Sequence, residues 1–210
     1  MTNNLEFLLS LSILAPLIAG VVRFSKITKS YYPLIYLIIA GFIAEMASYF
    51  SNGNAAITNV YVLAEYIFYC WLFYNWKNVL TKKNSLFLLI ISFTLLWFIE
   101  NILLNKINTF DQYYRIIYSI ALVLLAVNQL NYLVINEREN IFLNATFILC
   151  CSMIIFYSYK CLMEIFYRYA HNSVIETNVF SIQAYVNVLF NILLTLVVLC
   201  LPKKRTITLR

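Results

Sequence analysis

Seven long apolar runs limit what this chain can fold into. Each run is about 18 to 26 residues long, and a helix of that length crosses the roughly 30 Å hydrocarbon core of a bilayer at 1.5 Å per residue. Membrane-spanning strands would instead show polar alternation in segments of about ten residues, which the runs lack. The pattern predicts membrane-spanning helices over residues 5–22, 31–50, 58–76, 85–104, 113–135, 141–166 and 179–202.

The composition favours a membrane bundle over a soluble domain. Of the 210 residues, 63% are hydrophobic and 11% are charged. A soluble domain is roughly half apolar and about a quarter charged, so the excess of apolar residues is expected to face lipid. The runs and their short connections use nearly the whole chain. We therefore predict a single all-α integral membrane domain over residues 1–210, folded as a seven-transmembrane-helix bundle.

The basic residues predict how the bundle is oriented. Four of the fifteen Lys and Arg residues lie in or beside the connections after even-numbered runs: Lys106, Arg115, Lys160 and Arg168. The other eleven follow odd-numbered runs: Arg23, Lys26, Lys29, Lys77, Lys82, Lys83, Arg138, Lys203, Lys204, Arg205 and Arg210. Because Lys and Arg are enriched in cytoplasmic loops, we expect the N-terminus outside and the C-terminus in the cytoplasm. A multi-pass protein of the cytoplasmic (inner) membrane is predicted.

The first run could be taken for a cleaved signal peptide, but its charges argue against this. A signal peptide has a basic segment before its apolar core. Here Arg23, Lys26 and Lys29 follow the apolar segment. We expect run 5–22 to be retained as the first span.

The net charge of +6 does not indicate nucleic-acid binding, because the basic residues are accounted for by the topology. They also favour anionic headgroups, so membrane lipids are the expected partners. The sole histidine, His171, is expected in an exposed loop, and zinc sites draw on several His or Cys ligands, so neither a metal site nor a cofactor is predicted. Five cysteines inside the runs are expected to act as buried small hydrophobes: Cys70, Cys150, Cys151, Cys161 and Cys200.

Ionisable residues within the runs form the candidate site. With the predicted topology, runs two to six each place an ionisable group in the outer half of the membrane, and the last run adds amides on one helical face. Tyr61 and Tyr69 are four residues before and after Glu65, so they share its face. The predicted ligand-binding residues are Glu45, Glu65, Lys160, Glu164, Arg115, Glu100, Asn187, Tyr61 and Tyr69.

Glu65 is the most informative of these residues. A carboxylate at a helix centre costs about 2.5 to 3.5 kcal/mol on insertion, whereas each Leu, Ile, Phe or Val contributes about 0.3 to 0.6 kcal/mol in favour. Run 58–76 holds seven such apolar residues, so Glu65 nearly cancels their contribution. We expect its side chain to face the bundle interior, where it is paired, protonated or next to water.

Two interpretations of these charges remain open. Four acids (Glu45, Glu65, Glu100 and Glu164) face three bases, so one acid is left to be protonated or to meet a ligand. Alternatively, the charges only hold helices together, since polar contacts in membranes contribute about 0.6 kcal/mol each on average. Residues near the run ends, such as Glu100 and Arg115, are also close enough to the interface to snorkel.

The third run carries a family resemblance. It reads NVYVLAEYIFYCWLFYNW, an apolar run with a central Glu and many aromatic residues that follows a polar turn. In this the chain resembles a group of small, uncharacterised seven-span bacterial membrane proteins, a likeness that covers the whole length loosely and implies no activity. In size and character it is also similar to membrane accessory proteins beside some RNA-targeting CRISPR effectors. Retinal proteins and seven-span sugar carriers share the predicted topology. A retinal protein needs a lysine in its last span, and those sugar carriers have a Pro-Gln motif, but the last run here has no lysine and the chain has no Pro-Gln pair.

Three function classes follow. The first is a binding or sensory module with an outward-facing polar pocket for a small molecule or lipid headgroup, which signals through a protein partner at the cytoplasmic loops. The second is a membrane enzyme that modifies lipids, with Glu65 and Glu45 as acid and base. The third is a defence-associated component that acts by assembly as a homo-oligomer or by pore formation. We favour the first, since no nucleophile–base pair or metal motif is legible in the sequence.

Overall fold

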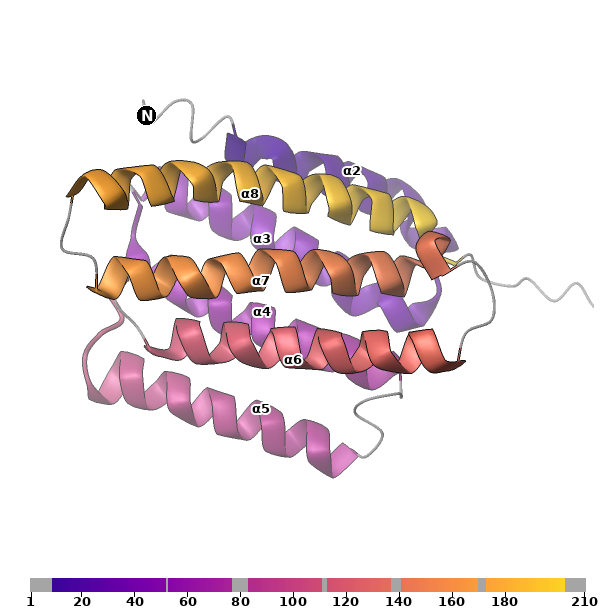
Figure 1. The fold of residues 1–210 in the computed structure, drawn as a ribbon, viewed down its shortest axis with the longest axis horizontal. Helices are drawn as coiled ribbons and strands as arrows, with labels where there is room; N and C mark the ends of the chain where they lie inside the picture. Colours follow the sequence, from indigo (N-terminus) through magenta and orange to yellow (C-terminus); the bar gives the residue numbers. More distant parts are fainter. Residues whose placement is uncertain are drawn as a thin grey trace, which may run out of the picture.

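The computed structural model describes residues 9–51, 53–76, 83–110, 113–136, 141–169 and 173–202, and leaves out the side chains of residues 142 and 167–181. Within these ranges the chain is helical and contains no strand. Consecutive long helices run in opposite directions and lie side by side (Figure 1). They are α2 (Leu14–Arg23), α3 (Tyr32–Phe50), α4 (Ala55–Trp76), α5 (Lys83–Phe98), α6 (Tyr113–Asn136), α7 (Ala145–Tyr169) and α8 (Ser173–Cys200).

Six helical segments are long and apolar enough to cross a membrane. They are Lys29–Phe50, Ala55–Trp76, Lys83–Leu103, Tyr113–Asn136, Ala145–Phe166 and Ile182–Cys200. These segments overlap runs two to seven, so the prediction of a multi-span helical membrane protein is confirmed for six runs. The first run, 5–22, lies partly outside the described residues, and α2 (10 residues) covers its second half from Leu14 and ends one residue beyond it, at Arg23. A seventh span therefore remains a prediction.

Local signals in the sequence explain where several helices begin. Pro33 occupies the first turn of α3, where a missing backbone N–H leaves no hydrogen bond unmade. The Asn54 side chain accepts a hydrogen bond from the Ala56 N–H at 2.9 Å, ahead of the first turn of α4. Asn144 does the same for Thr146 at 2.8 Å at the start of α7. Side-chain oxygens of this kind satisfy N–H groups that the helix itself leaves free.

The long helices form two groups around a common interior. α7 lies between α6 and α8, α3 and α4 pack together behind them, and α2 lies along α8 (Figure 1). α5 packs mainly against α4 at the edge of the bundle and contributes no buried residue. The faces that point outward carry large apolar side chains such as Val22 (70% exposed) and Ile135 (80%), as a lipid-facing surface requires.

Tyrosines occupy much of the interior between α4, α6 and α7. Five of them are among the largest side chains that are fully buried: Tyr66, Tyr69, Tyr114, Tyr118 and Tyr157. The rings of Tyr114 and Tyr118 stack at 5.6 Å, and Tyr157 meets the edges of Tyr69 and Tyr118 at 5.8 and 6.0 Å. Such offset and edge contacts suit aromatic quadrupoles. Tyrosine packing therefore places phenol oxygens inside the bundle, around the charged residues described below.

Arg23 connects the first described helix to the last one. Its guanidinium donates to the carbonyl oxygens of Val198 at 3.0 Å and Leu201 at 3.2 Å, and it also contacts the Leu199 carbonyl. The last carbonyls of a helix have no partner within the helix and carry partial negative charge. Arg23 thus caps the C-terminus of α8 and holds α2 against it.

Candidate functional site

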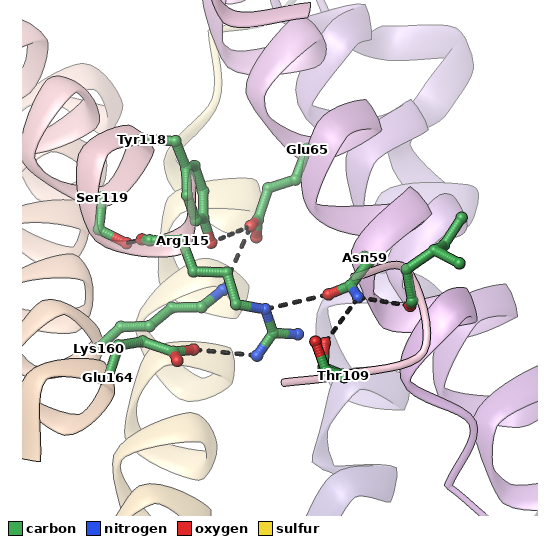
Figure 2. Close-up of polar contacts among 9 residues, drawn as sticks. Asn59, Glu65, Thr109, Arg115, Tyr118, Ser119, Lys160 and Glu164 are labelled. Atoms are coloured by element: carbon green, nitrogen blue, oxygen red, sulfur yellow. Dashed lines mark hydrogen bonds and ion pairs between the residues drawn. The ribbon is translucent and has the colours of Figure 1, made fainter. Parts of the chain in front are cut away.

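Buried charged residues gather at the end of the bundle where α4 and α6 begin and α3 and α7 end. We call this group the charged layer: Glu45, Asn59, Glu65, Glu100, Arg115, Lys160 and Glu164. Figure 2 shows most of these side chains converging from α4, α6 and α7. Glu65, Glu100, Arg115 and Glu164 are 4 to 7% exposed. These four residues thus avoid lipid, as the insertion cost of a charge predicts.

Glu65 accepts hydrogen bonds from three donors on three helices. The Tyr118 hydroxyl donates to it at 2.9 Å, and the Lys160 ammonium lies 3.4 Å from the same oxygen. The Tyr61 hydroxyl donates to the other oxygen at 3.4 Å. Gly41 of α3 makes room for that phenol, because a β-carbon there would meet its hydroxyl at 3.1 Å. Each oxygen of the Glu65 carboxylate therefore faces at least one protein donor.

The Lys160 ammonium lies close to three aromatic rings as well as to Glu65. Its ammonium lies 5.1 Å from the Tyr118 ring centroid and 5.7 Å from those of Phe156 and Tyr157. Cation–π attraction within about 6 Å compensates part of the water that a buried cation loses. The three rings and the Glu65 carboxylate together form the surroundings of the ammonium.

A second ion pair joins α6 to α7 one helical turn away. Arg115 donates from Nη1 to Glu164 at 2.9 Å and from Nε to the Asn59 oxygen at 3.2 Å. The Phe110 ring covers the guanidinium, with its centroid 5.3 Å from Cζ. The remaining nitrogen, Nη2, is buried and has no hydrogen-bond partner among the described residues.

Asn59 organises the connection between α5 and α6, a role that the sequence analysis missed. Its amide nitrogen donates to the carbonyls of Ile107 at 2.8 Å and Thr109 at 3.0 Å, and its own carbonyl accepts from the Trp97 indole at 2.9 Å. The chain is rich in asparagine, so a single Asn carries little signal in the sequence. Tyr118 was also missed, although its spacing of three residues from Arg115 predicts a shared helical face.

Glu100 has a structural role. It lies in η4 (Ile99–Leu103), a π-helical turn that continues α5 and turns Glu100 and Asn101 inward, where both are buried. Its two carboxylate oxygens accept the backbone N–H groups of Tyr113 and Tyr114, each at 2.7 Å. These are unpaired donors of the first turn of α6, where the helix dipole also favours a negative charge. Glu100 therefore caps α6 from a neighbouring helix.

Three other predicted residues stand apart from the two ion pairs. Glu45 is half-buried on α3, hydrogen-bonds Ser10 and lies near Lys160, but it makes no ion pair with the described residues. The Tyr69 hydroxyl lies near Glu65 and interacts with the side chain of Tyr157. Asn187 is half-buried on α8 and no described contact joins it to the charged layer. His171 and the side chain of Arg168 lie outside the described residues.

Within the described ranges the acids outnumber the bases in the charged layer. Two carboxylates are paired with two cations, and Glu100 is used by the backbone of α6. Glu45 is then the acid without a counter-charge of its own. The described residues contain no group of three or more His, Cys, Asp or Glu that could hold a metal ion. The layer therefore offers hydrogen bonding and charge as its chemistry.

No family model matches this chain, and no curated protein or solved structure is similar to it at a significant level. The charged layer has to be interpreted from its own contacts. Both carboxylate oxygens of Glu65 and of Glu100 meet protein donors, whereas among the described residues Glu45 has no ion pair and Arg115 Nη2 has no acceptor.

Proposed function

We propose that the protein is an integral membrane binding or sensory module whose charged layer takes a small polar molecule or a lipid headgroup. The observation that carries this proposal is the incomplete pairing of the layer. Glu45 has no ion-pair partner and Arg115 Nη2 has no acceptor among the described residues. A layer that only held helices together would gain most by closing every pair, because an unpartnered buried polar group is costly.

The predicted topology indicates on which side of the membrane the charged layer lies. With the N-terminus outside and seven spans, the charged layer faces outward, and the basic connections at the other end face the cytoplasm. The connections are short and contain no domain that could act as an output. Occupancy of the site would therefore be read by a protein partner that contacts the cytoplasmic ends of the helices.

The layer links the helices that would carry such a signal. Glu45 lies on α3, Glu65 on α4, Arg115 on α6, and Lys160 and Glu164 on α7. A ligand group that binds the Glu45 carboxylate competes with the nearby Lys160 ammonium for it. The attraction of Lys160 to Glu45 then weakens relative to its attraction to Glu65. A ligand changes a conformational equilibrium only through such differential contacts.

Native mass spectrometry of the full chain in detergent micelles tests the proposal. The wild type is expected to retain a small molecule or a specific lipid, and Glu45→Gln is expected to lose it. Glu100→Gln is the matched control, because it removes a carboxylate of the same layer that α6 already uses. A retained molecule in the control and not in Glu45→Gln supports the proposal.

Two outcomes contradict it. If the wild type carries no molecule in micelles or in bilayer nanodiscs, the layer is a structural network. If Glu45→Gln and Glu100→Gln lose a bound molecule equally, the loss reflects general destabilisation and Glu45 is no ligand contact.

A further inference from the structure

The unused nitrogen of Arg115 lies in a defined environment. Nε and Nη1 are held by Asn59 and Glu164, so the plane of the guanidinium is fixed on two sides. Arg115 is 6% exposed, and Nη2 is buried without an acceptor among the described residues. A hydrogen bond from such a buried, charged N–H group to an acceptor is strongly favourable, because the group has already lost its hydrogen bonds to water.

The direction of Nη2 indicates where an acceptor would sit. In Figure 2 this nitrogen points towards the segment that carries Thr109, between the Asn59 and Glu164 contacts. Asn59 holds that segment in place through the carbonyls of Ile107 and Thr109. Asn105 and the residues from 108 to 110 are exposed, so the segment covers Arg115 from the end of the bundle. An incoming molecule reaches Nη2 by displacing this short cover.

We propose that Arg115 Nη2 binds an oxyanion of the ligand, a phosphate or carboxylate oxygen. This inference rests on the proposed binding function and names the chemistry of the bound group. A guanidinium with two N–H bonds free on one nitrogen recognises such oxygens through charge-assisted hydrogen bonds.

The position of Arg115 along its helix admits two sources of the oxyanion. Arg115 is the third residue of α6, which places its backbone about 3 Å from the start of the helix at 1.5 Å per residue. The ends of spanning helices lie near the headgroups of the bilayer. The oxyanion is thus either a lipid phosphate or a soluble phosphate or carboxylate that enters from water.

Arg115→Lys removes Nη2, together with the Nε hydrogen bond to Asn59, and leaves a cation that can pair with Glu164. Lysine keeps a cation beside Glu164 and lacks the second guanidinium nitrogen. The assay measures thermal unfolding of the full chain in detergent micelles with added inorganic phosphate, acetate or chloride at matched ionic strength. A second arm adds phosphatidylglycerol or a glycolipid without phosphate. We expect phosphate, acetate or phosphatidylglycerol to raise the melting temperature of the wild type, with an affinity at least about tenfold weaker in Arg115→Lys.

The two arms identify the source, and each result is decisive. Stabilisation by phosphatidylglycerol and not by the soluble anions assigns the site to a lipid phosphate, and the reverse assigns it to a soluble oxyanion. Equal affinity in wild type and Arg115→Lys overturns the inference. A molecule that native mass spectrometry finds lost in Glu45→Gln but retained in Arg115→Lys also overturns it and leaves the binding function standing. A wild type that no probe stabilises and that retains no molecule overturns both.

Chemical labelling of the wild type covers the case in which Arg115→Lys fails to fold. Phenylglyoxal modifies an arginine only while its guanidinium is accessible, so Arg115, which is 6% exposed, is labelled as its covering segment opens. Peptide mass spectrometry compares the labelling rate of Arg115 with that of Arg23, which is held by the α8 carbonyls. The stabilising anion is expected to protect Arg115 and leave Arg23 unchanged. Equal labelling of Arg115 with and without the anion overturns the inference.

Discussion

Replacing Glu65 with leucine breaks the ion pair between α4 and α7, and the cost can be worked out from the contacts. At 3.4 Å, two unit charges attract by about 5 kcal/mol with an effective dielectric constant of 20. Loss of one partner of a buried pair costs about 3 to 5 kcal/mol, because the other charge is left buried. Glu45 remains near Lys160 and offsets part of this loss. We expect Glu65→Leu to lower the free energy of unfolding by about 3 kcal/mol.

The double variant makes the prediction sharper. Lys160→Met alone leaves Glu65 without its cation, at a cost of about 3 kcal/mol. Glu65→Leu with Lys160→Met replaces the whole pair with apolar side chains, and we expect it to cost clearly less than the sum of the two single losses, although the Tyr118 and Tyr61 hydroxyls lose their acceptor. Glu65→Gln keeps acceptor and donor atoms for Tyr118 and Tyr61, so it is expected to fold and to fall between the wild type and Glu65→Leu.

Unfolding by SDS in dodecyl maltoside micelles, followed by tryptophan fluorescence, measures these free energies. Lys83→Met is the control, because Lys83 is exposed at the start of α5 and its loss is expected to change stability by less than about 0.5 kcal/mol. The reasoning is refuted if the double variant loses the sum of the two single losses within about 0.5 kcal/mol, since independent sites behave in that way.

Three further variants test other parts of the fold, two of them in the same unfolding assay and the third by hydrogen exchange. Glu100→Gln weakens the cap of α6 and is expected to cost about 1 to 2 kcal/mol, and an unchanged stability would show that the cap is dispensable. Gln129 is fully buried, and neither atom of its side-chain amide has a partner among the described residues. Gln129→Leu is therefore expected to raise the free energy of unfolding by about 1 to 3 kcal/mol, and a decrease instead would reveal a water or ligand bound to the amide. Arg23→Gln removes the cap of α8, and hydrogen exchange of its last turn is expected to rise while that of α6 stays constant.

The sequence by itself determined that this chain forms membrane-spanning helices and that Glu65 faces inward. Both conclusions follow from transfer free energies, which depend on the residues of one segment and not on their neighbours in space. Lipid offers no hydrogen-bond partners, so a long apolar run must be helical, and a carboxylate within it must turn away from lipid. Six of the seven predicted spans and the burial of Glu65 agree with this reasoning.

Only the tertiary structure decided which charge meets which partner. The spacing alone assigned none of the acids Glu65, Glu100 and Glu164 to a particular base. The packing of α4 and α6 against α7 brings Glu65 to Lys160 and Glu164 to Arg115, while the π-helical turn delivers Glu100 to the backbone of α6. A hydrogen bond or an ion pair between two helices forms only if the two atoms lie within a few ångströms of each other. That distance depends on how three helices pack together, which the apolar pattern of each helix does not encode.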